Sequence, residues 1–245
     1  MNNWQKLKWL ILSGITESIG EKPVNRLVDR PSAKVQVVQE TEAKQDKPED
    51  TFLMQAKALM QDVKTVSELY KKREDFDGCS LKKTAGYTLN GYGTLNPTVL
   101  CLVEAPDTID EKNALLMGGE NGVLFGKMLS AIGLDLNQNT YVSSLIPWRP
   151  PGNRKPTDAE HAVCRPVWEQ EIQILKPKMI VAFGAGVSEQ LLGINALSKA
   201  RGRWHDYQGI PVRVSIAPAT LLKMPNQKKM AWEDLQAVAE KLKEL

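Results

Sequence analysis

Cysteine is scarce in this sequence, with only three among 245 residues: Cys79, Cys101 and Cys164. Three scattered cysteines cannot form the disulfide framework that holds many small secreted domains together. The cysteine content therefore favours a protein of the reducing cytosol.

Long hydrophobic runs are also absent. Near the amino terminus, the longest apolar run has four residues, at 9–12, and no small-residue cleavage site follows it. A secretory signal peptide is therefore not predicted. No later run approaches the roughly 18 apolar residues that a membrane-spanning helix needs. We expect a cytoplasmic protein that makes no contact with a membrane.

Neither sign of charge dominates, because 32 Lys and Arg residues stand against 29 Asp and Glu residues, for a net charge of +3. Such a balance permits a nucleic-acid partner without requiring one, since net charge does not show where charges cluster. The length leaves room for one sizeable core and an appendage. No internal repeat is visible, and a monomer is expected.

The first 51 residues are expected to lie outside the main domain. Residues 1–28 predict a helical segment, whose apolar side at 4–19 could pack back onto its own domain or dock on a partner protein. Residues 29–51 are rich in Gln, Glu, Lys and Asp and predict a flexible polar linker. A helix from residue 52 to about 72 then opens a domain that covers 52–245.

Beyond this helix, short apolar runs alternate with helical segments, which is typical of an α/β domain. Thr157 and Glu160 have the spacing of a capping box and predict the start of a helix that reaches about residue 175. Interleaved helices imply a mostly parallel sheet that is covered on both faces. We predict a three-layer αβα fold with four central strands, at 98–103, 139–146, 179–183 and 210–216.

Carboxylates follow the first of these strands, at Glu104, Asp107 and Asp110. The carboxyl ends of parallel strands converge on one rim, where open α/β sheets bind their ligands. Carboxylates in this position could activate water, hold a metal ion or simply face solvent. The sequence leaves these three interpretations open.

A proline-rich loop at 148–156 follows the second strand. Its prolines and its glycine exclude a regular helix or a central strand, so the loop is expected to be rigid. It is rich in hydrogen-bond donors that suit a phosphate, or it is a connector whose charges are merely solvated. A second loop is expected after the fourth strand. There, Leu222 beside Lys223 could pack in the core or wedge into a base stack.

Together these motifs resemble the uracil-DNA glycosylase superfamily, most closely its family 4 type. The resemblance covers the chain from about residue 76 onward and rests on Tyr141, the run at 148–154, the helix with Cys164, and the segment 217–223. It implies a DNA partner and a pocket that receives an extruded base. The residues that would hold DNA are Arg149, Pro150, Asn153, Arg154, Lys155, Arg203, Leu222 and Lys223.

Three positions depart from the pattern of that family. Met117 stands where the family has an aromatic ring that stacks on the base, and Ser144 stands where it has an amide that reads the base edge. Ala217 stands where the family has an imidazole that stabilises the departing base. The two histidines of the chain, His161 and His205, lie outside this motif and are interpreted as surface or packing residues.

The resemblance also raises the question of an iron–sulfur cluster, which family 4 members commonly hold on four cysteines. Cys79 and Cys164 occupy two of the four positions, while Lys82 and Trp148 occupy the other two. Because such a cluster normally needs four ligands, we predict no cofactor and no metal. Cys101 is interpreted as a small buried apolar residue.

The three substitutions favour a DNA-binding member of the superfamily whose base excision is lost or strongly impaired. The first alternative is an active glycosylase for uracil or another damaged base, in which Glu104 or Asp110 positions a water molecule. The second is an adaptor that uses the fold as a platform for a partner protein. An imidazole or a carboxamide brought to the pocket from elsewhere in the chain would contradict the loss of activity.

Overall fold

The computed structural model describes residues 48–245, so the helical segment expected at 1–28 lies outside the described residues. Helix α2 (Pro48–Met60) begins within the range expected to be a linker, and that boundary was therefore wrong. The single helix expected at 52–72 is also wrong, because α2 ends before α3 (Val66–Glu74) begins. The hydroxyl of Thr65 accepts a hydrogen bond from the backbone N–H of Glu68 and so caps a new helix.

A six-stranded sheet forms the centre of the fold, in the order β1-β3-β2-β4-β6-β5. The four expected strands are its parallel middle: β2 (Val99–Val103), β3 (Thr140–Ser144), β4 (Met179–Phe183) and β6 (Ile210–Ser215). The expected α/β class is confirmed, with two strands more than predicted.

The additional strands are the antiparallel edges β1 (Tyr92–Gly93) and β5 (Trp204–Tyr207). The first is too short to show a pattern, and the second carries polar residues that do not read as a strand. A tight turn at Gln208 and Gly209 joins β5 to β6, with φ values of 53° and 85°. Two positive φ values in succession are the geometry that joins neighbouring antiparallel strands.

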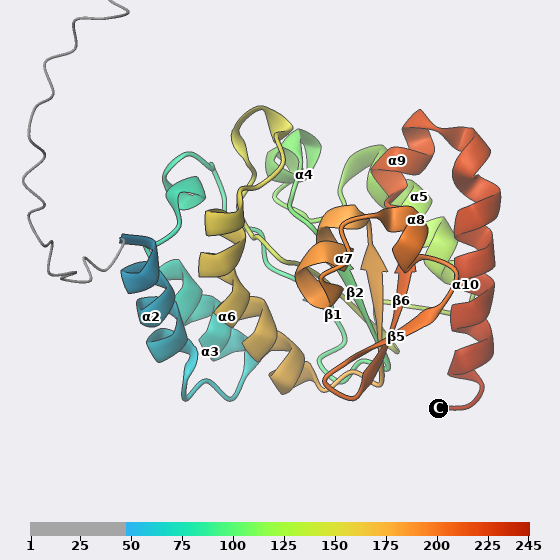
Figure 1. Cartoon of the computed structure of the whole chain (residues 1–245), viewed down its shortest axis with the longest axis horizontal. Helices are drawn as coiled ribbons and strands as arrows, with labels where there is room; N and C mark the ends of the chain where they lie inside the picture. The colour runs from blue at the N-terminus through green and yellow to red at the C-terminus, as the bar shows by residue number, and fades with distance from the viewer. Residues whose placement is uncertain (1–47) are drawn as a thin grey trace, which may run out of the picture. The chain divides into compact units, whose positions relative to one another are not determined.

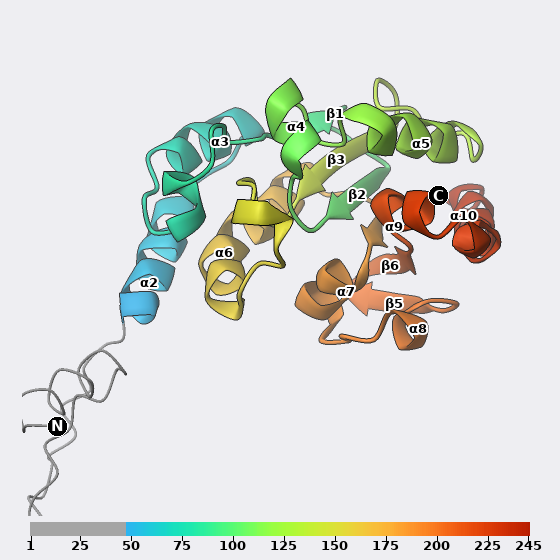
Figure 2. The ribbon, with the colours of Figure 1, turned by 90° about the horizontal axis from the view of Figure 1, so that it is seen from above.

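Helices cover both faces of the sheet (Figures 1 and 2). Leu100 and Leu102 of β2 share a core with Trp168 of α6 (Asp158–Leu175). Val99 and Cys101 face the other way and share a second core with α5 (Gly119–Ser130) and α10 (Lys228–Leu242). Successive residues of a strand point to opposite faces, so fully buried strands supply both cores. The interpretation of Cys101 as a buried apolar residue is confirmed.

The path of the chain places a topological switch point between β2 and β4. From β2 the chain passes through α5 to β3 on one side, and from β3 it returns through α6 to β4 on the other side of β2. Ligands of open α/β sheets bind at the carboxyl ends of strands that flank such a point.

Short elements complete the described chain. They are α4 (Thr108–Asn113), α7 (Ala185–Leu192), α8 (Leu197–Ala200), α9 (Pro218–Lys223), η1 (Ser80–Lys83), η2 (Pro151–Asn153) and η3 (Pro225–Gln227). The predicted capping box is confirmed, since Thr157 and Glu160 each accept a hydrogen bond from the other's backbone N–H. Among the helices of residues 48–245, none is long and apolar enough to cross a bilayer.

A buried ion-pair cluster fixes α10 to the sheet. Asp234 of α10 accepts hydrogen bonds from Arg213 of β6, at 2.9 Å, and from Arg201, at 2.5 Å. Asp234 is fully buried, and both arginine side chains are largely buried. Removal of this carboxylate would leave two cations without their counter-charge.

We expect Asp234→Ala to lower the free energy of unfolding by about 3–5 kcal/mol, because it leaves Arg213 and Arg201 unpaired in a buried setting. Urea denaturation would measure the change. Glu233→Ala, at the exposed neighbouring position of the same helix, is the control and should change stability by about 0.5 kcal/mol or less. Equal effects of the two substitutions would show that the cluster does not stabilise the fold.

Candidate functional site

A pocket of about 390 Å³ opens at the switch point of the sheet. Its walls come from the carboxyl ends of β2 and β4, from the start of α7 and from the segment that follows β6. Its volume lies in the range of small-molecule sites in proteins. The polar and conformationally special residues that line it are Glu104, Asp107, Asp110, Asn121, Lys155, Gly184, Gly186 and Thr220.

Both carboxylate oxygens of Asp107 already accept hydrogen bonds from neighbouring residues. Its Oδ1 accepts hydrogen bonds from the backbone N–H groups of Ile109, at 2.7 Å, and Asp110, at 2.9 Å, so that it caps α4. Its Oδ2 accepts a hydrogen bond from the amide of Asn121 at 2.8 Å. A carboxylate with three donors is held in place and is poorly suited to move a proton.

Asp110 holds the segment after α4 against the pocket. It is buried, and its two oxygens accept hydrogen bonds from the backbone N–H groups of Gly118, at 2.6 Å, and Asp107, at 3.3 Å. Burial, together with the charge of Asp107, raises the pKa of Asp110 to about 6. Asp110 lines the pocket, and the role that its hydrogen bonds show is structural.

Glu104 is the carboxylate that the local structure leaves free. Its side chain is 31% exposed and accepts no hydrogen bond from any residue of the described range 48–245. The Nε2 atom of His161, from α6, lies 3.6 Å from Oε1 of Glu104. Of the three candidate carboxylates, Glu104 is therefore the one available to a ligand or to water.

Gly186 makes room for the Glu104 side chain. A Cβ atom on Gly186 would lie only 2.1 Å from Oε1 of Glu104. Any other residue would therefore force the carboxylate away from the start of α7. The sequence pattern Gly-Ala-Gly after β4 marks a turn but does not reveal that the second glycine faces this carboxylate.

His161 was interpreted from the sequence as a surface or packing residue, and of these two it is a packing residue, 5% exposed on the buried side of α6. Its place beside the pocket carboxylate was not predicted. The helical spacing of His161, Cys164, Trp168 and Glu171, all buried, could have placed it on the inward face. His205, on edge strand β5, is half-buried and contacts the carbonyl of Ala200 at 2.7 Å.

The three positions that depart from the family pattern have different settings. Met117 and Ala217 line the pocket. Ser144 is buried at the end of β3 and does not line it. Asn121, from the first turns of α5, lines the pocket and brings a carboxamide that sequence reasoning missed. Its Nδ2 is taken by Asp107, while its Oδ1 has no partner among the described residues.

Side chains of the proline-rich loop pair with residues of neighbouring segments. Arg149 pairs with Glu111 at 2.5 Å. Asn153 accepts a hydrogen bond from Thr108 at 3.0 Å. Arg154 donates two hydrogen bonds to Glu160, at 2.6 and 2.8 Å, and this pairing lowers the pKa of Glu160 to about 2. Pro150 is buried beside them. These contacts hold the loop against its neighbours, and two of its three cations are already paired.

Lys155 is the cation of this loop that lines the pocket, and its ammonium has no ion-pair partner within residues 48–245. The guanidinium of Arg203 donates to the carbonyl of Lys199. Leu222 and Lys223 are exposed at the end of α9, where a loop had been expected. Their position beside pocket residue Thr220 keeps them candidates for contact with a ligand that covers the rim.

The donors near Cys79 and Cys164 do not fit an iron–sulfur cluster. The two thiols are buried and 3.9 Å apart. Lys82 is paired with Asp77 at 2.7 Å. Trp148 is packed in the core and donates its indole N–H to Thr88 at 3.0 Å. Within the described residues, no three or more His, Cys, Asp or Glu side chains gather as metal ligands.

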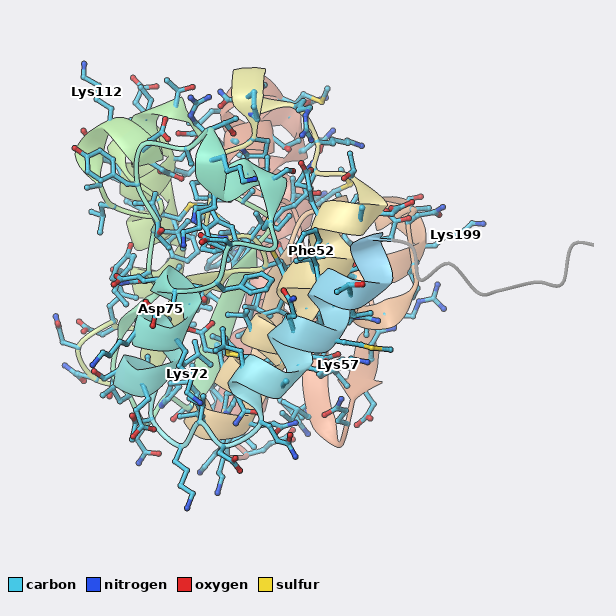
Figure 3. The ribbon with its side chains drawn as sticks, turned by 90° about the vertical axis from the view of Figure 1, so that its left-hand side faces the viewer. Phe52, Lys57, Lys72, Asp75, Lys112 and Lys199 are labelled. Atoms are coloured by element: carbon cyan, nitrogen blue, oxygen red, sulfur yellow. The ribbon has the colours of Figure 1, made fainter. Side chains whose placement is uncertain are left out.

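A larger groove of about 610 Å³ lies on the outer face of α2 and α3. Phe52, Lys72 and Asp75 line it (Figure 3). None of its lining residues comes from the carboxyl rim of the sheet, and it contains no group that could act together with Glu104. The pocket at the rim is therefore the candidate active site.

We expect Gly186→Ala to displace the Glu104 side chain at little cost in stability, about 1 kcal/mol or less, because the carboxylate is the flexible end of its chain. A crystal structure of the variant would show the new rotamer. Gly126→Ala in α5 is the control, since a Cβ there meets nothing within 4 Å. An unmoved carboxylate in the Gly186 variant would contradict this account of the pocket.

The raised pKa of Asp110 makes the stability of the fold depend on pH. The pKa of Asp110 is raised to about 6 from 3.8, so the folded chain holds this proton more tightly than the unfolded chain. Asp110 therefore stabilises the fold most at low pH, and this contribution is lost as the pH rises from about 4 through 6. Denaturation at several pH values should show that slope, and Asp110→Asn should flatten it. The exposed Asp62→Asn should leave the slope unchanged.

Comparison with known proteins tests the resemblance. Residues 90–236 match the uracil DNA glycosylase superfamily. A Type-4 uracil-DNA glycosylase of Sulfurisphaera tokodaii is 27% identical over 188 residues, which cover 71% of this chain and 85% of that protein. One of Pyrobaculum aerophilum is 29% identical over 179 residues, 69% of this chain and 91% of that protein.

A DNA polymerase of Bacillus phage SP01 is 26% identical over 160 residues, which are 65% of this chain and only 17% of the polymerase. The similarity to it is thus confined to one part of a much longer protein. The superfamily match covers more than half of this chain, including the pocket and the sheet that carries it. The chain belongs to the uracil DNA glycosylase superfamily.

Proposed function

We propose that the protein binds DNA, receives an extruded base in the rim pocket and hydrolyses the N-glycosidic bond of that base. Membership of the superfamily supports the reaction class. The single observation that carries the proposal is the uncommitted carboxylate of Glu104 in a pocket at the switch point of the sheet. A protein that only gripped the DNA backbone would not need this group.

Glu104 is assigned to the attacking water. Hydrolysis requires a water oxygen to bond to the sugar carbon while the bond from that carbon to the base nitrogen breaks. A carboxylate can orient this water and accept its proton. Asp107 and Asp110 are less suited, because backbone N–H groups already occupy their oxygens.

Lys155 and Asn121 are assigned to the base. The base leaves with the bonding electron pair, so negative charge develops on it, and the ammonium of Lys155 at the pocket wall would offset that charge. The free Oδ1 of Asn121 can accept a hydrogen bond from the edge of a base. Met117 offers an apolar surface for the face of the ring.

A second candidate function is DNA binding without base excision. It is favoured by Ala217 and Met117 at the pocket wall and by the burial of Ser144 away from it. Lys155, Leu222 and Lys223 could still hold a DNA backbone, because phosphate contacts need only charge and loop geometry. A protein platform without DNA is the third possibility.

The test is the formation of abasic sites in single- and double-stranded oligonucleotides that contain uracil or other deaminated bases. We expect abasic sites with the unmodified protein. Glu104→Gln should lower the rate by about 10²–10⁴-fold, because the amide cannot accept the proton of water. Glu189→Gln, an exposed substitution on α7, should leave the rate unchanged.

No abasic sites with any of these bases, together with salt-dependent binding of plain DNA, would refute excision and support the second candidate. If DNA binding is absent as well, the platform role would remain. Equal rates in the Glu104 and Glu189 variants would show that another group positions the water.

A further inference from the structure

The imidazole of His161 faces the pocket carboxylate from outside the motif that carries this group in the family. It lies in the first turn of α6, with Nε2 3.6 Å from Oε1 of Glu104. This separation is slightly longer than an N–H···O hydrogen bond, about 2.7–3.2 Å. A small movement of the Glu104 side chain would close it.

The surroundings of the second ring nitrogen indicate which tautomer of His161 fits the site. Nδ1 is buried and has no hydrogen-bond partner within the described residues. A buried N–H without an acceptor is rarer in proteins than an unpartnered acceptor. The ring is therefore best accommodated with its proton on Nε2, directed at Glu104, and with a bare lone pair on Nδ1.

The other charged groups near His161 are occupied elsewhere. On its own helix, Glu160 is bound by Arg154, and Arg165 pairs with Glu169. From the start of α7, Gly184, Ala185 and Gly186 line the adjoining pocket wall and carry no charge. Within residues 48–245, Glu104 is the one ion-pair partner of His161.

We propose that His161 is a positioning residue for the Glu104 carboxylate. It donates from Nε2 to Oε1 and keeps the second carboxylate oxygen directed into the pocket. Gly186 leaves space on the other side of the same carboxylate. His161 thus acts on the water through Glu104 and does not take the place of the imidazole missing at Ala217. The consequence for catalysis rests on the proposed function, whereas the contact itself does not.

Imidazole NMR tests the contact without reference to activity. The chain has two histidines, so two ring systems are expected, and His205→Gln assigns them. We expect a slowly exchanging, downfield Nε2–H proton for His161. Glu104→Met, which keeps the chain length but has no acceptor oxygen, should abolish it. The His205 signal, whose Nε2 lies 2.7 Å from the carbonyl of Ala200, should not change.

Activity tests the consequence. His161→Gln keeps an N–H donor and should retain most of the excision rate, whereas His161→Leu should lower kcat about tenfold or more with little change in KM. A Nε2–H signal that persists in Glu104→Met would overturn the proposal, as would equal rates in the Gln and Leu variants. Without any excision activity, the proposed function fails, and the NMR result alone decides whether the contact exists.

Discussion

The candidate site depends on the close approach of the Glu104 carboxylate to the backbone at the start of α7. Only glycine at position 186 permits it, because a Cβ atom would lie 2.1 Å from the carboxylate oxygen. The approach is possible because β2 and β4 are hydrogen-bonded neighbours, so the residues that follow them meet at one rim. The connections that follow β2 and β4 lead to opposite sides of the sheet, to β3 and to β5 and β6, which leaves the crevice that the carboxylate occupies.

The three carboxylates at the rim, Asp107, Asp110 and Glu104, have two different roles: the first two stabilise local structure, and the third is accessible from the pocket. Asp107 and Asp110 satisfy backbone N–H groups at the start of α4 and in the following segment that have no partner within the helix. This holds the pocket wall in place, and burial raises the pKa of Asp110 as a result. Glu104 is left without such partners, so it alone combines access to the pocket with free acceptor oxygens.

Sequence reasoning was most successful where structure is determined by neighbouring residues. The four buried strands and the capping box of Thr157 and Glu160 follow from local patterns, and all were found. The edge strands β1 and β5 depend on pairing with partners distant from them or on a turn, and they were missed. The rim position of Glu104 followed from topology, but its freedom from hydrogen bonds could be judged only once the bonds of Asp107 and Asp110 were known.

Ser144 and Ala217 alone do not determine whether base excision is lost. The reactivity of a pocket depends on every side chain that reaches it, including side chains from helices outside the family motifs. Asn121 belongs to α5 and His161 to α6, on opposite faces of the sheet. The first brings a carboxamide to the pocket, and the second places an imidazole against its free carboxylate. The carboxamide reaches the pocket itself, whereas the imidazole lies against Glu104 and does not replace the group missing at Ala217. A pocket that holds a free carboxylate beside a carboxamide is the physical reason to propose base excision and not an inert DNA grip.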